Sequence, residues 1–135
     1  MYKNILLPLA PDHGAVAEPA LAVARTLLSE GGRITVMTVL EAIPSYVAQY
    51  LPKDQEEKNR RDMAADLAAE FAAQSDVVTR VVSGQAAELI LTQATEGAHD
   101  CIIIASHRPG MQDYFLGSTA GRVVRHAQVS VHVLR

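Results

Sequence analysis

The stretch Cys101-Ile102-Ile103-Ile104-Ala105 places five apolar side chains in succession. A strand with one face in water alternates apolar and polar residues, whereas a strand covered on both faces is apolar throughout. Such strands belong to parallel sheets that have helices packed on both sides. We therefore expect these residues to form a strand that is buried on both faces.

Short apolar runs alternate with segments of helical period along the rest of the chain. Residues 16–28 repeat apolar side chains at helical spacing, and Gly31-Gly32 would stop that helix because glycine readily adopts the left-handed conformation at a C-cap. The expected strands are residues 5–7, 34–40, 77–82, 101–105 and 129–134, and the expected helices are residues 16–28, 54–74, 86–96 and 118–126.

This alternation predicts the fold class. Strands that alternate with helices imply right-handed crossovers and a parallel sheet. We expect an α/β fold, a doubly wound five-stranded parallel sheet with helices on both faces, in a single domain over residues 1–135. The segment 41–53 contains two prolines and is expected to be irregular. Its Tyr46 and Tyr50 would either line a pocket or anchor a loop.

Composition argues against several classes of function. The net charge is -3, and the densest basic stretch, residues 58–61, is flanked by Glu57 and Asp62. A nucleic-acid partner is therefore disfavoured, because it needs a basic face to neutralise phosphates. The single cysteine, Cys101, excludes an intrachain disulfide and points to a reducing compartment. The first apolar run is too short for a signal sequence or a membrane span, so we expect a cytoplasmic protein without a membrane segment.

We expect neither catalytic residues nor a metal site. Ser106 and His107 are adjacent, which is poor geometry for a nucleophile and its base, and no Gly-x-Ser-x-Gly elbow is present. His99, Asp100 and Cys101 could be drawn as metal ligands. However, Cys101 begins a buried strand, and no His-x-x-x-His or Cys-x-x-Cys accompanies it.

The loop after residues 101–105 has the residues of an anion-binding loop. Ligands of open doubly wound sheets sit beyond the C-terminal ends of the strands. Gly117-Ser118-Thr119 opens the last expected helix, where free N–H groups and the helix dipole favour an anion. Arg108 would clamp phosphate oxygens, and His107 would donate a hydrogen bond. The alternative is that Ser118 is only the N-cap of the helix and Gly117 only a turn residue.

These stretches carry a resemblance to the universal stress protein family. The opening residues 2–9 resemble that family's first strand. The loop sequence Ser-His-Arg-Pro at residues 106–109 resembles the corresponding loop in the family's small single-domain branch, which is called F/G. The resemblance covers the chain in element order and is most specific near the C-terminus. The stretches that resemble the family's C-terminal signature are residues 102–109, 116–120, 123–127 and 131–135.

The resemblance implies a Rossmann-like fold of the adenine nucleotide alpha hydrolase type and ATP, with Mg²⁺, as the ligand. It implies that Leu9 and Val39 flank the adenine. It places ribose and phosphates against residues at the end of the fourth strand and at the start of the last helix. Those residues are Ser106, His107, Arg108, Gly117, Ser118 and Thr119.

The chain departs from the family's nucleotide-binding pattern at three positions. The family's Gly-x-x-Gly pair falls here on Ala105 and Arg108. At the second position the long cationic side chain of arginine stands where a glycine would leave the backbone accessible to a phosphate. The family's binders carry an aspartate after the first-strand proline, where this chain has Ala10 and a displaced Asp12. These departures keep a second hypothesis open, a nucleotide-free dimeric interaction module.

The resemblance also implies a regulatory homodimer of the stress response rather than a committed enzyme. The dimer would form through the last strand, Val129 to Leu134, because an unpaired apolar edge invites strand addition. The alternative is an ordinary edge strand that His132 and Arg135 protect. A third hypothesis is slow ATP hydrolysis or self-phosphorylation, for which the sequence offers no identifiable general base.

Overall fold

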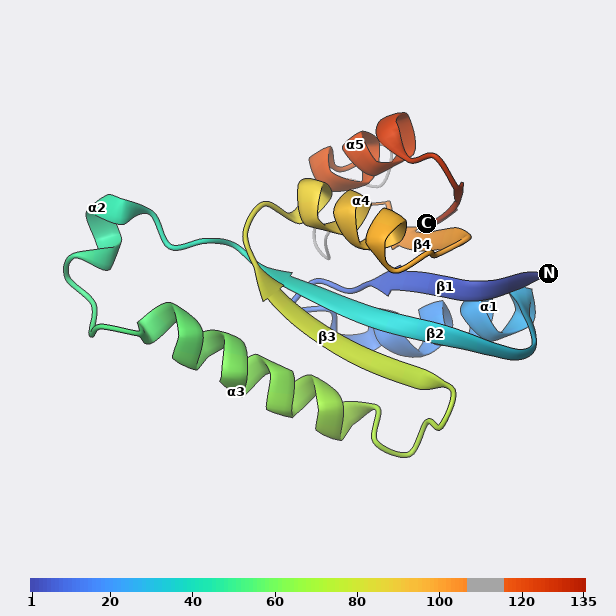
Figure 1. Cartoon of the computed structure of the whole chain (residues 1–135), viewed down its shortest axis with the longest axis horizontal. Helices are drawn as coiled ribbons and strands as arrows, with labels where there is room; N and C mark the ends of the chain where they lie inside the picture. The colour runs from blue at the N-terminus through green and yellow to red at the C-terminus, as the bar shows by residue number, and fades with distance from the viewer. Residues whose placement is uncertain (107–115) are drawn as a thin grey trace.

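A computed structural model describes residues 1–106 and 116–135 of the chain. Within these residues, five strands form one parallel sheet in the order β3-β2-β1-β4-β5. Helices α1 and α3 cover one face, and α4 and α5 cover the other (Figure 1). The predicted doubly wound α/β fold is therefore confirmed. The elements are β1 (Tyr2–Pro8), the 3-10 turn η1 (Gly14–Val16), α1 (Ala17–Leu27), β2 (Leu28–Leu40), α2 (Ser45–Ala48), α3 (Gln55–Glu70), β3 (Val77–Ser83), α4 (Ala86–Glu96), β4 (Cys101–Ala105), α5 (Ser118–His126) and β5 (Ser130–Leu134).

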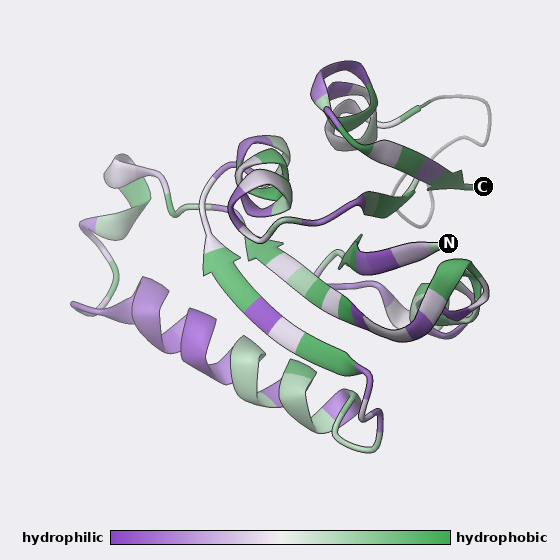
Figure 2. Cartoon of the chain, turned by 45° about the vertical axis from the view of Figure 1, so that its right-hand side comes forward, coloured by the Kyte–Doolittle hydropathy of each residue, from purple (hydrophilic) through white to green (hydrophobic). Residues whose placement is uncertain are grey.

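The two central strands, β1 and β4, are buried on both faces, which the sequence predicted for β4. In β1, Ile5 and Leu7 pack toward α1 and α3, whereas Leu6 packs toward α4 and α5, and all three are 0% exposed. In β4, Ile103 joins the first of these clusters and Ile102 the second. Figure 2 shows this hydrophobic colour in β4 and at the C-terminal end of β1. Each apolar run thus supplies core residues to two separate helical layers.

The strand order reverses between β1 and β4. β2 and β3 extend the sheet from one side of β1, and β4 and β5 extend it from the other. At such a reversal the connections that leave the two central strands turn toward opposite faces, which opens a crevice beyond their C-terminal ends. The fold therefore places its crevice where the residues after β1 and after β4 diverge.

The predicted helix stop at Gly31-Gly32 is wrong. Helix α1 ends at Leu27, and β2 begins at the next residue, Leu28. The two glycines lie inside β2, at a point where the pairing register with β1 shifts. Gly31 has a φ of 75° there, in the left-handed region that favours glycine. The left-handed conformation of Gly31 therefore belongs to an irregularity in the pairing of β1 with β2. A rule based on helix ends alone does not predict such an irregularity.

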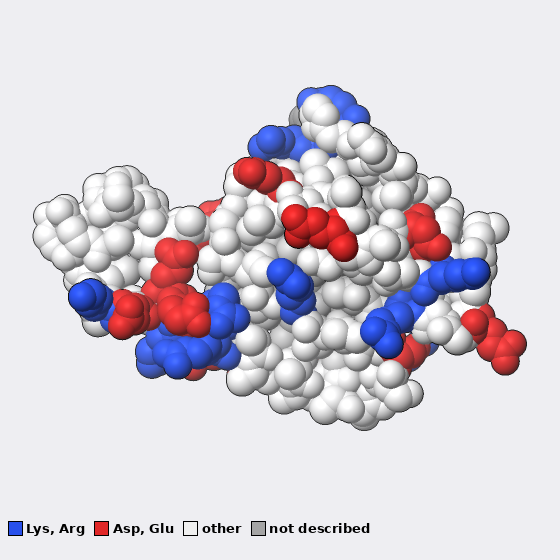
Figure 3. All heavy atoms as spheres, viewed as in Figure 1, with Lys and Arg blue, Asp and Glu red and all other residues white. Residues whose placement is uncertain are grey.

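Helix α3 is shorter than expected and is only partly covered. It ends at Glu70, not at residue 74, and its buried contacts come from Leu67 and the adjacent Phe71. Its first half carries charged side chains that pair with one another, such as Lys58 with Asp62 (Figure 3). This half of the helix extends beyond the sheet, so it adds little to the core (Figure 1).

The segment between β2 and α3 projects from the molecule and contains the short helix α2 (Figure 1). Tyr46 and Tyr50 in this segment are 71% and 83% exposed. Neither is among the described residues that line the pocket beyond the sheet, so the expectation that they line it is wrong. Within residues 1–106 and 116–135, no helix has the length and apolar character that crossing a bilayer requires.

His99 is a buried titratable group between α4 and β4. The residue is 5% exposed, and the side-chain amide nitrogen of Gln93 lies 3.2 Å from its Nε2 atom. Within the described residues, Nδ1 has no hydrogen-bond partner. Burial lowers the pKa of His99 below its ordinary value, because the charged ring would lose its hydration.

We predict that the protein loses stability as the pH falls below about 6.5, the ordinary pKa of imidazole. The unfolded chain then protonates His99, whereas the folded ring resists the proton, so acid favours the unfolded state. One such group changes the free energy of unfolding by at most about 1.4 kcal/mol per pH unit. Urea unfolding across this range should show a steeper fall for the wild type than for His99→Gln. Equal slopes in the two proteins would contradict the assignment, since all other titratable groups are shared.

Candidate functional site

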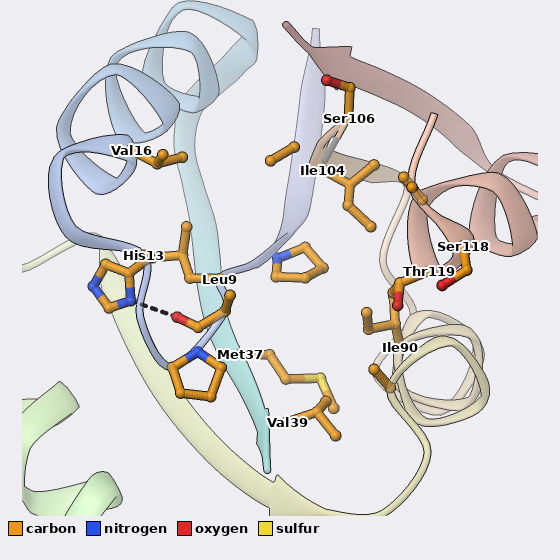
Figure 4. A pocket seen from close by; sticks show the side chains of 17 residues that line it. Leu9, His13, Val16, Met37, Val39, Ile90, Ile104, Ser106, Ser118 and Thr119 are labelled. Carbon is orange, nitrogen blue, oxygen red and sulfur yellow. Dashed lines mark hydrogen bonds between the residues drawn. The ribbon is translucent and has the colours of Figure 1, made fainter. Parts of the chain in front are cut away.

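A pocket of about 170 Å³ lies beyond the C-terminal ends of β1, β2 and β4. Residues from the β1–α1 connection form one wall, and the start of α5 forms the opposite wall (Figure 4). The position is the crevice that the strand reversal creates. It is also where doubly wound sheets bind their ligands.

The inner part of the pocket is an apolar slot. Met37 and Val39 project into it from β2, Ile104 from β4 and Ile90 from α4 (Figure 4). All four residues are at least nine-tenths buried. A planar, largely apolar ring fits such a slot, because its contact with these side chains removes apolar surface from water.

The start of α5 supplies the polar wall. The helix begins at Ser118, and its N-cap residue is Gly117, which has no side chain to bond the first N–H groups. The alternative that Ser118 is the N-cap is therefore wrong. The hydroxyls of Ser118 and Thr119 line the same wall (Figure 4). Exposed N–H groups at a helix start carry partial positive charge and favour an anion.

Backbone hydrogen bonds anchor this wall to the sheet. The N–H of Gly117 donates to the carbonyl of Ser106 over 2.6 Å, and the N–H of Ser106 donates to the carbonyl of Leu134 over 2.7 Å. Ser106 is 1% exposed. The first turn of α5 is thus held directly against the end of β4, and through it against β5.

The β1–α1 connection makes the facing wall and is also held by hydrogen bonds. The N–H of Leu9 donates to the carbonyl of Met37 over 2.9 Å, which ties the connection to β2. His13 donates its backbone N–H to the carbonyl of Ala10 over 3.1 Å. The Nδ1 atom of the same side chain lies 2.7 Å from that carbonyl oxygen (Figure 4). Ala10 therefore presents a methyl group and a fully engaged carbonyl to its surroundings.

The described residues that line the pocket are almost all uncharged. Among the described residues that line it, His13 is the single titratable one, and both of its ring nitrogens already have partners. Within the same part of the chain, no three histidine, cysteine or carboxylate side chains gather as a metal site would require. The geometry suits the binding of a ring and an anionic group more than acid–base chemistry.

The structure brings together most of the residues that the sequence singled out. His107 and Arg108 lie outside the described residues. Met37 and Ile104 were missed, although each could be found as a neighbour on the strand that carries Val39 or Ala105. The predicted residues that line the pocket are Leu9, Ala10, Val39, Ala105, Ser106, Gly117, Ser118 and Thr119.

Comparison with known proteins adds a family assignment to this geometry. The model of the universal stress protein family matches residues 1–135. Universal stress protein G of Salmonella typhimurium (strain LT2) is 26% identical over 145 residues, and the match covers 100% of both chains.

Solved structures show the same fold at lower identity. Universal stress protein UspA from Lactobacillus plantarum superimposes with a TM-score of 0.73 at 23% identity, covering 99% of this chain and 98% of that one. A universal stress protein in complex with cAMP gives a TM-score of 0.66 at 16% identity, covering 99% and 97%.

We predict that the hydrogen bond between Gly117 and Ser106 stabilises the fold measurably. Gly117 has a φ of -58°, which proline also adopts, but proline has no N–H to donate. Gly117→Pro should lower the free energy of unfolding by about 1–3 kcal/mol relative to Gly117→Ala, because it leaves the buried carbonyl of Ser106 without this donor. Urea denaturation of both variants checks this. Equal stabilities would show that the bond contributes nothing.

Proposed function

Because the chain belongs to the universal stress protein family, we propose that its pocket binds an adenine nucleotide, with ATP as the expected ligand, and that it acts as a ligand-responsive regulator in the stress response. One observation carries the proposal. An apolar slot and the uncapped start of a helix line one pocket, at the strand reversal.

The two ends of the pocket match the two ends of a nucleotide. The adenine would lie between Leu9 and Val39, against the apolar slot, and the ribose would lie near Ala105 and Ser106. The phosphates would then face the N–H groups at the start of α5 and the hydroxyls of Ser118 and Thr119. The family member with bound cAMP supports an adenine-bearing ligand for this fold.

The phosphates would rely on few protein charges. Among the described residues, no carboxylate lines the pocket, and Asp12 is exposed outside it. A Mg²⁺ ion would therefore be held by phosphate oxygens and water, which is an ordinary arrangement for this cation. Arg108 and His107 would add positive charge and a hydrogen-bond donor.

A regulatory role fits the chemistry of the pocket better than catalysis. Its described hydroxyl groups come from Ser106, Ser118 and Thr119, and efficient phosphoryl transfer to any of them needs a positioned base. His13 cannot serve as that base while both of its ring nitrogens are engaged. We place the protein in the cytoplasm, where its one cysteine, the buried Cys101, stays reduced.

We predict that ATP with Mg²⁺ raises the melting temperature of the protein. Binding at a hundredfold excess over Kd adds about 2.7 kcal/mol to stability. Gly117→Val should abolish the shift, because a branched side chain at the helix start blocks the approach of a phosphate. Gly121→Val is the matched control, since a Cβ there meets nothing closer than 3.9 Å and the shift should persist.

The outcomes separate the hypotheses. A melting temperature that millimolar ATP leaves unchanged in the wild type would reject nucleotide binding and leave the interaction module. If ATP still raises the melting temperature of Gly117→Val, the start of α5 does not contribute to the binding site. Mass spectrometry of the denatured protein would show whether a nucleotide co-purifies.

We further propose a homodimer that forms through β5. Within the described part of the chain, β5 pairs with β4 on one side only. The carbonyl of Leu134 points to the β4 side, where it accepts from Ser106. Successive residues of a strand direct their backbone groups to alternate sides, so those of Val131 and Val133 point to the open edge. A second copy of β5 would complete that edge.

We predict that Val131→Pro prevents this dimer. Proline removes an N–H that points to the open edge and spares the ladder with β4. Val131→Ala keeps the N–H and controls for the lost side chain. Sedimentation velocity should show a dimeric wild type and Val131→Ala variant and a monomeric Val131→Pro variant. A wild type that sediments as a monomer would reject the dimer.

A further inference from the structure

His13 connects the ligand pocket to a helix that does not line it. The residue is 9% exposed and lies in the pocket wall after β1. Its Nδ1 atom is 2.7 Å from the carbonyl oxygen of Ala10, inside the same wall. Its Nε2 atom is 2.9 Å from each carboxylate oxygen of Glu70, the last residue of α3. The ring therefore bridges two parts of the chain that are 57 residues apart.

The two partners of the ring require two protons. A backbone carbonyl and a carboxylate are both acceptors, whereas a neutral imidazole has a single N–H to donate. Both contacts are hydrogen bonds at once only when the His13–Glu70 pair holds a second proton. In that state the imidazolium faces the carboxylate. Charge-assisted hydrogen bonds of this kind are roughly twice as strong as neutral ones.

The other charged groups near Glu70 do not compete for it. Glu18 and Arg25 of α1 line the groove in which Glu70 lies. Glu18 is itself an acid, and Arg25 is already paired with Asp76 over 2.8 Å. Among the described residues, His13 is thus the side chain that pairs with Glu70.

The bridge acts on the shape of the pocket wall. The carbonyl of Ala10 receives two hydrogen bonds from His13, one from the ring and one from the backbone N–H. The carbonyl of His13 in turn accepts from the N–H of Val16. Val16 is the last residue of η1 and directly precedes α1. Leu9 and Ala10, both pocket residues, lie immediately before this pinned turn.

We propose that Glu70, outside the pocket, is a positioning residue for ligand binding that acts through His13. The His13–Glu70 pair is a latch that holds the turn after β1 in the shape that the pocket needs. The effect on nucleotide affinity rests on the function proposed above. The latch itself does not, because it is a property of the ligand-free protein.

The direct test is amide hydrogen exchange in the ligand-free protein. Glu70→Ala should speed exchange at the amides of His13 and Val16 about five- to tenfold, because the turn opens more often. Asp66→Ala removes another exposed carboxylate, one turn earlier on α3, and should change neither amide. Equal exchange in the two variants would overturn the proposal. Glu70 has a side chain that is 41% exposed, so its loss leaves the core intact.

A spectroscopic readout separates the latch from a merely structural contact. In ¹H–¹⁵N spectra, the Nδ1–H of His13 that donates to the carbonyl of Ala10 should be visible in the wild type and in Asp66→Ala. This signal should be lost in Glu70→Ala, and Glu70→Gln should behave as an intermediate because it keeps one acceptor oxygen. A wild type whose Nδ1 shows no such proton would overturn the proposal.

Calorimetric titration with ATP tests the consequence for binding. Glu70→Ala and His13→Ala should each weaken affinity about three- to tenfold, and the double variant should bind no more weakly than His13→Ala, because the two residues act as one unit. Additive losses would contradict the latch. If the wild type binds no ATP, the proposed function fails, while hydrogen exchange and the ring signals still decide the latch.

Discussion

The pairing of β1 with β4 is the constraint on which the rest of the structure depends. Ile5 lies opposite Cys101 and Leu6 opposite Ile102, so two apolar runs from opposite ends of the chain meet at the centre of the sheet. Each fully buried side chain of this size contributes about 1.5–3 kcal/mol by leaving water. Because these strands are buried on both faces, helices must cover both faces. The sheet then grows outward from this pair in two directions.

The pocket follows from that reversal and is built largely from backbone hydrogen bonds. One wall belongs to the first half of the chain and is tied to the sheet by the bond from Leu9 to Met37. The other belongs to the second half and is tied by the bond from Gly117 to Ser106. Among the described residues, neither wall presents a lysine, arginine or carboxylate side chain to the pocket. The arrangement is therefore rigid at its base and suits recognition by shape and by helix polarity.

At Ala10 the polar contacts come from the backbone and not from the side chain. The family's nucleotide binders, as the resemblance implies, have an aspartate here whose carboxylate meets the ligand. In this chain the polar feature of the residue is its carbonyl, and His13 occupies that carbonyl from two directions. The turn is thereby connected to Glu70 on α3.

The sequence by itself determined the elements whose signals are local. Residues 86–96, 101–105 and 118–126 were predicted with the bounds that the structure shows, because helical period and unbroken apolar runs reside in neighbouring residues. The residues at the start of α5 were likewise identified by their position before a helix. Only the tertiary structure decided the role of Gly31, the contribution of Ile90 to the slot and the contact of His13 with Glu70. Each depends on which distant segment lies opposite, and hydrogen bonds and packing form between neighbours in space, which local sequence patterns do not encode.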